Sequence, residues 1–408
     1  MLKDAATEFD LLGFSPYVEG LAELILSTPT PLTVGIFGGW GTGKTSFILM
    51  IMKKLSKMKT TKVVLFNPWQ FQGEENLTIP LLQTIRETAP KSTKTICELK
   101  KIGSVISVAL SQVLLKTITI GSLNVEQIEN FGEKFEQKMS EIAKVRELFE
   151  SSLIEIVGKN GKLVIFIDDM DRCLPETALL MLESIKLFLS VERVIFVIAT
   201  DKKILYQAIE VRYTEKGFSE APFKGEEYIE KFIPLPFTVP IPTQDQLSSF
   251  IKHHANELKL KLNDAIIPLV ISIIGRNPRK IKRFLNVLCL LTKFLFKLGF
   301  ISDPYTAYLT KLQLLQEKWP SLYGEILNNS EILIWAEVWL KKQDIKVNSL
   351  SANQKNIYKT YFSTDLDCRL KYLFNTPPLF SNTDSIDVLV QLIQTGNVQF
   401  EYQSSHKN

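Results

Sequence analysis

One glycine-rich turn constrains the fold of this chain more than any other feature of its 408 residues. Gly38-x-x-x-x-Gly43-Lys44-Thr45 follows an apolar run at 32–37 and precedes a second apolar run. In such a turn, glycines permit the dihedral angles that aim successive backbone N–H groups at one anion, and the helix that follows adds its dipole. The placement between a strand and a helix predicts a phosphate-binding loop in an α/β fold.

The chemistry of this loop predicts ATP and Mg²⁺ as cofactors. Lys44 is expected to reach the β- and γ-phosphates, and the Thr45 hydroxyl to coordinate Mg²⁺. Trp40 either covers the nucleotide or packs under the loop, and we favour packing. The predicted nucleotide-binding residues are Gly38, Gly39, Trp40, Gly41, Thr42, Gly43, Lys44, Thr45 and Ser46.

A group of aspartates follows the strongest buried-strand pattern in the chain. A phosphate loop needs a carboxylate on a neighbouring strand to hold Mg²⁺ through water, and Asp168 stands at the end of an apolar run. Asp169 is predicted to be the catalytic residue that orients the attacking water, with Asp171 as the alternative. A cluster that only caps the helix opened by Pro175 is the structural alternative. Because aspartate is shorter than the glutamate usual in related ATPases, we expect slow or partner-dependent hydrolysis.

Two polar residues that close the next predicted strand are candidates for sensing the γ-phosphate. Thr200 and Asp201 either do so or cap the turn that follows. The sequence contains no Asn-Lys-x-Asp motif for reading guanine, so the nucleotide is expected to be ATP.

A basic stretch after the predicted sheet has three interpretations. Arg276 and Arg279 either contact the γ-phosphate from a helical lid, or belong to a solvated helix face, or contact nucleic acid, which is the weakest reading. Arginine would stabilise transition-state charge through forked hydrogen bonds that lysine cannot match. Arg172 either pairs with Asp169 or Asp171, or acts toward the phosphate of a neighbouring subunit.

Taken together, these features resemble the KAP family of P-loop NTPases over about residues 10–300. The matching segments are GFSPYVEGLAELI at 13–25, GGWGTGKTS at 38–46, FNPWQF at 66–71, IFIDDMDRCLPE at 165–176, ATD at 199–201, YIEKFIPLPF at 228–237 and NPRKIKRFLN at 277–286. The resemblance implies an ATPase whose catalytic-acid strand is inserted between the phosphate loop and its magnesium strand. It also implies frequent association with membranes and, in bacteria, defence against phages and other mobile elements.

Strand and helix patterns alternate in the first part of the chain, which predicts a parallel sheet flanked by helices. The expected strands are 32–37, 62–69, 162–171, 193–201 and 232–240, the last at an edge because of its prolines. The expected division is 1–71 for the first part of the P-loop NTPase core, 72–160 for a mostly helical insertion between the second and the aspartate strand, 161–241 for the rest of the core, 242–300 for a helical lid-like region and 301–408 for a helical C-terminal region.

Composition narrows the location and the partners. The net charge of +4 is too small to indicate a nucleic-acid binder by itself. The four cysteines lie far apart and the first residues lack a signal-peptide pattern, so a reducing cytoplasm is expected. Many KAP proteins carry transmembrane helices in the insertion, but the uncharged run between Lys101 and Lys116 is too short to span a bilayer. We expect the segment at 102–125 to pack against another helix, and the histidines at 253–254 to lie at the surface.

The sequence as a whole predicts a Mg²⁺-dependent ATPase that acts as the switch or motor subunit of a larger assembly, in antiviral (anti-phage) defence. Protein partners in a multi-subunit complex are expected, a homo-oligomer stays an open alternative, and nucleic acid has weak support. The rival is a non-hydrolysing scaffold that ATP stabilises, and a membrane-associated scaffold is a third alternative. No nuclease or protease constellation is evident in the sequence, so effector chemistry is expected from another chain.

Overall fold

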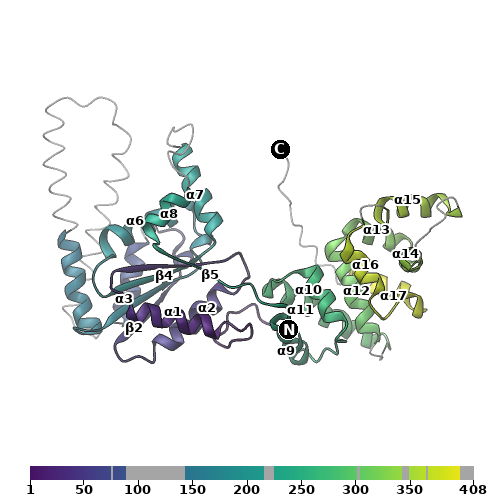
Figure 1. Cartoon of the computed structure of the whole chain (residues 1–408), viewed down its shortest axis with the longest axis horizontal. Helices are drawn as coiled ribbons and strands as arrows, with labels where there is room; N and C mark the ends of the chain where they lie inside the picture. Colours follow the sequence, from purple (N-terminus) through teal and green to yellow (C-terminus); the bar gives the residue numbers. More distant parts are fainter. Residues whose placement is uncertain are drawn as a thin grey trace. The chain divides into compact units, whose positions relative to one another are not determined.

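The computed structural model describes residues 1–74, 77–88, 143–215, 225–300, 304–341, 349–363 and 366–395. The chain divides into two units, which Figure 1 shows. The sheet unit comprises Ala6–Asp10 and Phe14–Pro240, and the helical unit comprises Met1–Ala5, Leu11–Gly13 and Ile241–Asn408. The finer five-part division expected from the sequence stays a prediction.

The sheet unit contains one parallel sheet. Its strands are β1 (Leu32–Phe37), β2 (Thr61–Phe66), β3 (Lys162–Ile167), β4 (Val194–Thr200) and β5 (Leu235–Thr238). Their order is β2-β3-β4-β1-β5, and every pairing is parallel. The proline-containing β5 lies at an edge, as expected. The strand inserted between β1 and β3 is β4, which ends at Thr200, whereas Asp169 follows β3. The inserted strand therefore does not carry Asp169, the predicted catalytic acid.

Helices cover both faces of this sheet because its crossovers run in opposite directions. The helix α2 (Lys44–Leu55) leads from β1 toward β2, whereas α6 (Pro175–Ser184) leads from β3 toward β4. Right-handed parallel crossovers that run in opposite directions place their helices on opposite faces. In Figure 1, α1 (Ser15–Ser27) and α2 accordingly lie on one side of the sheet, and α6, α7 (Lys202–Glu215) and α8 (Gly225–Phe232) on the other.

The strands of this sheet form the centre of the core. On the face of α6, apolar side chains of β2, β3 and β4 pack with those of α3 (Thr78–Thr88), the helix at 143–157, α6, α7 and α8. Strands buried on both faces read as continuous apolar runs, which is why β3 and β4 gave the clearest patterns. The further elements of the sheet unit are α1 (Ser15–Ser27), η1 (Pro68–Phe71), α3 (Thr78–Thr88), η2 (Met170–Arg172), η3 (Ile185–Leu189), α7 (Lys202–Glu215) and α8 (Gly225–Phe232).

The helical unit contains helices and no strand within its described residues. Proline is the first residue of α11 (Pro278–Lys297), α12 (Pro304–Lys318) and α13 (Pro320–Asn328), where its missing N–H costs nothing and its fixed φ suits the first turn. The helices are α9 (Gln244–Glu257), α10 (Ile266–Ile274), α11 (Pro278–Lys297), α12 (Pro304–Lys318), α13 (Pro320–Asn328), α14 (Ile332–Lys341), α15 (Ala352–Tyr361), α16 (Cys368–Asn375), η5 (Phe380–Asn382) and α17 (Ile386–Thr395).

The expected insertion at 72–160 is described only at its two ends, both helical. The segment at 102–125, for which close helix packing was expected, lies outside the described residues. Among the helices that are described, none combines the length and the apolar character needed to cross a bilayer.

Candidate functional site

The phosphate loop joins β1 to α2, and its glycines occupy places that a side chain would disturb. Gly41 and Gly43 have φ of 79° and 100°, in the left-handed region that glycine tolerates best. A Cβ on Gly38 would lie 2.7 Å from Oγ1 of Thr42. Gly43 precedes the first residue of α2, so the unpaired N–H groups of that helix begin directly after the loop.

Lys44, the cation expected to meet the β- and γ-phosphates, is only 8% exposed. Its Nζ donates to the carbonyl oxygens of Gly38 at 2.9 Å and Gly39 at 3.4 Å. The same nitrogen lies 3.4 Å from Oδ2 of Asp171. The ammonium group is therefore bound by the loop that carries it and by the aspartate cluster, and Asp171 is engaged with this lysine.

Asp168 and Thr45 meet at the predicted magnesium site. Asp168 is 4% exposed, and the Thr45 side chain lies close enough to its carboxylate to favour the charged form by hydrogen bonding. Burial raises the pKa of the Asp168 carboxyl, although the bond from Thr45 opposes that rise. Oδ1 of Asp168 is buried and has no hydrogen-bond partner in the described part of the chain. An unpaired buried carboxylate oxygen beside a hydroxyl suits a hard divalent cation, so these residues fit Mg²⁺.

Asp169 has both carboxylate oxygens engaged. Its Oδ1 lies 2.9 Å from Nη2 of Arg172, and its Oδ2 accepts a hydrogen bond from the side-chain amide of Asn67 at 3.0 Å. The backbone of Asp169 has φ of 56°, which turns the chain from β3 into η2. Arg172 thus pairs with Asp169, one of the alternatives that the sequence left open.

Asn67 is the candidate that sequence reasoning missed. It directly follows β2, whose last residue Phe66 is opposite Ile167 of β3, so its side chain can reach the aspartates. Its Oδ1 accepts from the backbone N–H of Trp69 at 3.0 Å, which fixes the orientation of the amide. A polar residue at the carboxyl end of a parallel strand was the signal that could have identified it.

Two tryptophans flank the guanidinium of Arg172. Its Cζ lies 5.2 Å from the ring centroid of Trp69 and 6.0 Å from that of Trp40. At these distances an indole face attracts a cation. Trp40 is 66% exposed, so the expectation that it packs under the loop is wrong.

The two sensor candidates differ in their surroundings. Thr200 is buried at the end of β4, and its hydroxyl has no hydrogen-bond partner among the described residues. Oδ1 of Asp201 accepts from the backbone N–H of Lys203 at 3.0 Å, and the Asp201 carbonyl accepts from Leu205 N–H at 3.2 Å. Asp201 therefore caps the start of α7, and a contact of Thr200 with a γ-phosphate stays a prediction.

Arg276 and Arg279 belong to the helical unit, where α11 begins at Pro278. Arg276 is exposed. Nε of Arg279 donates to Oδ1 of Asp4 at 2.9 Å within the same unit. The phosphate loop belongs to the other unit, and an approach of either arginine to a γ-phosphate stays a prediction.

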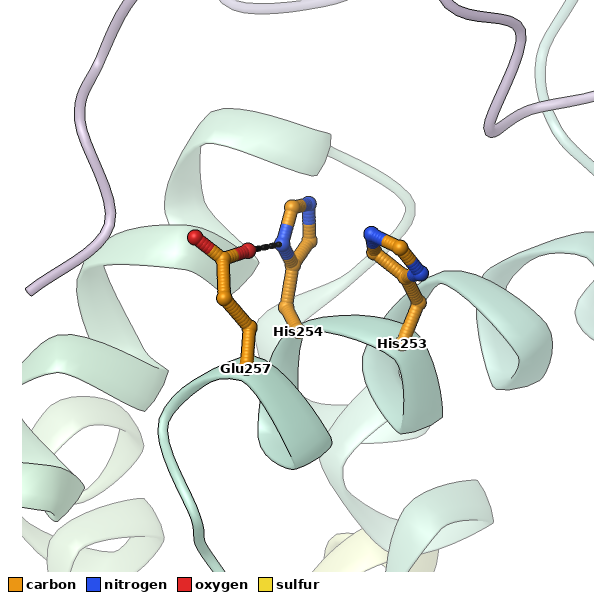
Figure 2. Close-up of side chains that lie close together, drawn as sticks. All are labelled: His253, His254 and Glu257. Carbon is orange, nitrogen blue, oxygen red and sulfur yellow. Dashed lines mark hydrogen bonds and ion pairs between the residues drawn. The ribbon is translucent and has the colours of Figure 1, made fainter.

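Of the two histidines on α9 that were expected at the surface, His253 is exposed as expected, whereas the expectation is wrong for His254, which is only 5% exposed. Figure 2 shows its Nδ1 bonded to the Glu257 carboxylate, at 3.1 Å, with His253 beside it. These three residues offer metal-ligand atoms within 4.8 Å of one another. Burial lowers the pKa of His254, so the neutral ring donates its Nδ1–H to Glu257. A metal at Nδ1 would move that proton to the buried Nε2, which has no acceptor in the described chain, so a structural pair explains the arrangement better.

Comparison with known proteins assigns the chain to a family. The model described as KAP family P-loop domain matches residues 14–295. The Phage T7 exclusion protein of Escherichia coli (strain K12) is 24% identical over 380 residues, with 84% of this chain and 48% of that protein covered. The chain thus spans about half the length of that relative.

Solved structures also align with most of the chain. The ORC2 protein of Aeropyrum pernix, in ADPNP–ADP complexes, aligns over 97% of both chains with 13% identity and a TM-score of 0.39. The Walker-type ATPase paby2304 of Pyrococcus abyssi aligns over 97% of this chain and 99% of its own, with 11% identity and a TM-score of 0.39.

Proposed function

The chain belongs to the KAP family of P-loop NTPases, and we propose that it is a Mg²⁺-dependent ATPase that switches or drives a larger assembly. One observation carries the proposal: the buried, unpaired Oδ1 of Asp168 beside the Thr45 side chain. A buried polar atom left without a partner costs about 1–3 kcal/mol, more for a charged group. A bound cation removes that cost.

Each residue of the site has one task in this proposal. The backbone N–H groups of the loop bind the phosphates, and Lys44 exchanges its carbonyl partners for β- and γ-phosphate oxygens. Thr45 and Asp168 hold Mg²⁺, which neutralises phosphate charge when it is bound. Asp169 orients the attacking water, and the buried hydroxyl of Thr200 contacts the γ-phosphate.

We further propose that this activity serves phage exclusion in the cytoplasm, as one subunit of a complex with other proteins. The support is the likeness to the Phage T7 exclusion protein, of which this chain covers 48%. In this proposal the chain supplies a nucleotide-dependent step, and a partner supplies the chemistry that acts on the phage.

One observation favours a second candidate, a scaffold that binds ATP without hydrolysing it. Both carboxylate oxygens of Asp169 already accept from protein donors. If they stay engaged, the site binds nucleotide and leaves water unactivated. Turnover distinguishes the two candidates.

The test is phosphate release from ATP by the purified chain and by Lys44→Ala. We expect the substitution to lower turnover by at least about a hundredfold, since a preorganised contact to transition-state charge is lost. Lys53→Ala is the matched control, because Lys53 lies on the same helix and pairs at the surface with Glu8. If the parent hydrolyses ATP above background and a folded Lys44→Ala protein hydrolyses it at the same rate, the assignment is disproved. If the parent releases no phosphate above the background measured without protein, the scaffold is favoured.

A further inference from the structure

We propose that Arg172 is a positioning residue that holds the Asp169 carboxylate in a resting ion pair, and that ATP turnover requires this pair to open. The inference rests on the proposed role of Asp169 in orienting the attacking water. It adds a restraint inside the site to that proposed reaction.

The ion pair acts on the atoms that would receive the water. Nη2 of Arg172 forms an ion pair with Oδ1 of Asp169 at 2.9 Å, while the neutral side-chain amide of Asn67 donates a hydrogen bond to Oδ2. These two bonds use acceptor positions of the carboxylate that would otherwise accept a hydrogen bond from the attacking water. The neighbouring Asp171 does not relieve this restraint, because it pairs with Lys44.

The surroundings of Arg172 hold its guanidinium in the resting position. The rings of Trp69 and Trp40 both lie at cation–π distances from it. The backbone N–H of Trp69 also binds Oδ1 of Asn67, so η1 fixes both groups that engage Asp169. Movement of Trp69 would therefore loosen both bonds to the carboxylate.

The pair is poorly placed to serve stability alone. The side chains of Arg172 and Asp169 are 30% and 17% exposed, and ion pairs that water reaches contribute little to folding. The turn of η2 has its own backbone bonds, from Arg172 N–H to the Asp169 carbonyl at 3.1 Å and from Cys173 N–H to the Met170 carbonyl at 3.2 Å. A substitution of the Arg172 side chain leaves these bonds intact.

The experiment measures kcat and KM for ATP in the full-length parent and in Arg172→Gln, Asp169→Asn and the double variant. We expect Arg172→Gln to raise kcat roughly fivefold, the rate equivalent of the strongest exposed ion pairs, with KM unchanged. The kcat of Arg172→Lys should lie between those of the parent and Arg172→Gln, because lysine keeps the positive charge but cannot form the forked hydrogen bonds of arginine. Arg146→Gln, a substitution on the helix at 143–157 where Arg146 binds the Ser190 carbonyl, is the matched control.

The double variant separates a restraint on Asp169 from a general loosening of the site. If Arg172 acts through Asp169, the gain disappears in Arg172→Gln/Asp169→Asn, which should turn over as slowly as Asp169→Asn. If Asp169→Asn is slow while Arg172→Gln matches the parent or is slower, the restraint is disproved and the role of Asp169 stands. If Asp169→Asn keeps the parent rate, the role of Asp169 fails and the restraint fails with it.

Discussion

The two units of the chain each bury one lysine among their described residues, and the two lysines have similar partners. In the sheet unit, Nζ of Lys44 donates to the carbonyl oxygens of Gly38 and Gly39. In the helical unit, Nζ of Lys311 donates to those of Thr376 and Pro378, both at 3.0 Å. An ammonium group surrounded by carbonyl oxygens is therefore not by itself a sign of a ligand site.

The difference lies in what holds the oxygens. The partners of Lys44 belong to a surface loop that the fold leaves open to a nucleotide. The partners of Lys311 belong to the segment between α16 and η5, which Glu337 fixes by accepting from the backbone N–H groups of Phe380 and Ser381. Burial lowers the pKa of Lys311 to about 8, against the charge of Glu337, which raises it. Lys311 thus has a structural role in the helical unit, whereas Lys44 can exchange its carbonyl partners for phosphate oxygens.

Replacing each lysine by methionine gives the largest effect that sharpens this comparison. We expect Lys311→Met to lower the free energy of unfolding by about 2 kcal/mol, because two buried carbonyl oxygens lose their donor. ATP turnover should stay at the parent level. Lys44→Met, the matched variant, should abolish turnover at little expense of stability. Urea denaturation measures the stability of both variants, and phosphate release measures their ATP turnover. A Lys311→Met protein as stable as the parent would contradict the structural role of Lys311.

The pH dependence of stability in the parent and in Lys311→Met tests whether burial lowers the pKa of Lys311. The pKa of Lys311 is about 8 in the folded chain and 10.5 in the unfolded chain, so the unfolded state binds more protons between these values. Stability of the parent therefore rises with pH across that window, relative to Lys311→Met. The difference between the two unfolding free energies should widen from pH 8 to pH 10, and a constant difference would show that Lys311 does not titrate there.

The same contrast explains what the sequence could predict. Lys44 belongs to a contiguous motif whose spacing reflects a local backbone shape, so the loop and the strands around it were predictable. Lys311 donates to carbonyl oxygens that lie 65 and 67 residues away in the sequence, and no local sequence pattern predicts such contacts. Asn67 was missed for the same reason, because its contact with Asp169 arises from the pairing of β2 with β3. The burial of His254 and the exposure of Trp40 likewise depend on packing that periodicity does not describe.

The smallest expected effect tests whether the helical unit also contributes a residue to nucleotide binding. If Arg276 or Arg279 of the helical unit reaches the γ-phosphate, alanine at that position should weaken ATP binding severalfold, roughly 1 kcal/mol, and leave ADP binding unchanged. Asp4→Ala is the control for Arg279, because it removes only the partner that Nε binds. Equal losses for ATP and ADP would contradict a γ-phosphate contact. Normal turnover with a salt-sensitive loss of DNA or RNA binding would instead favour nucleic acid.

The central claim is that Asp168 holds the metal and Asp169 acts on the water, and the most direct measurement is ATP affinity and turnover in Asp168→Asn and Asp169→Asn with and without Mg²⁺. The account predicts that Asp168→Asn loses most of the Mg²⁺-dependent part of ATP affinity, since it replaces the buried carboxylate beside Thr45. It predicts that Asp169→Asn binds Mg²⁺ and ATP as the parent does and turns over at least about tenfold more slowly. Identical defects in the two variants, or unchanged Mg²⁺ dependence in Asp168→Asn, would contradict it.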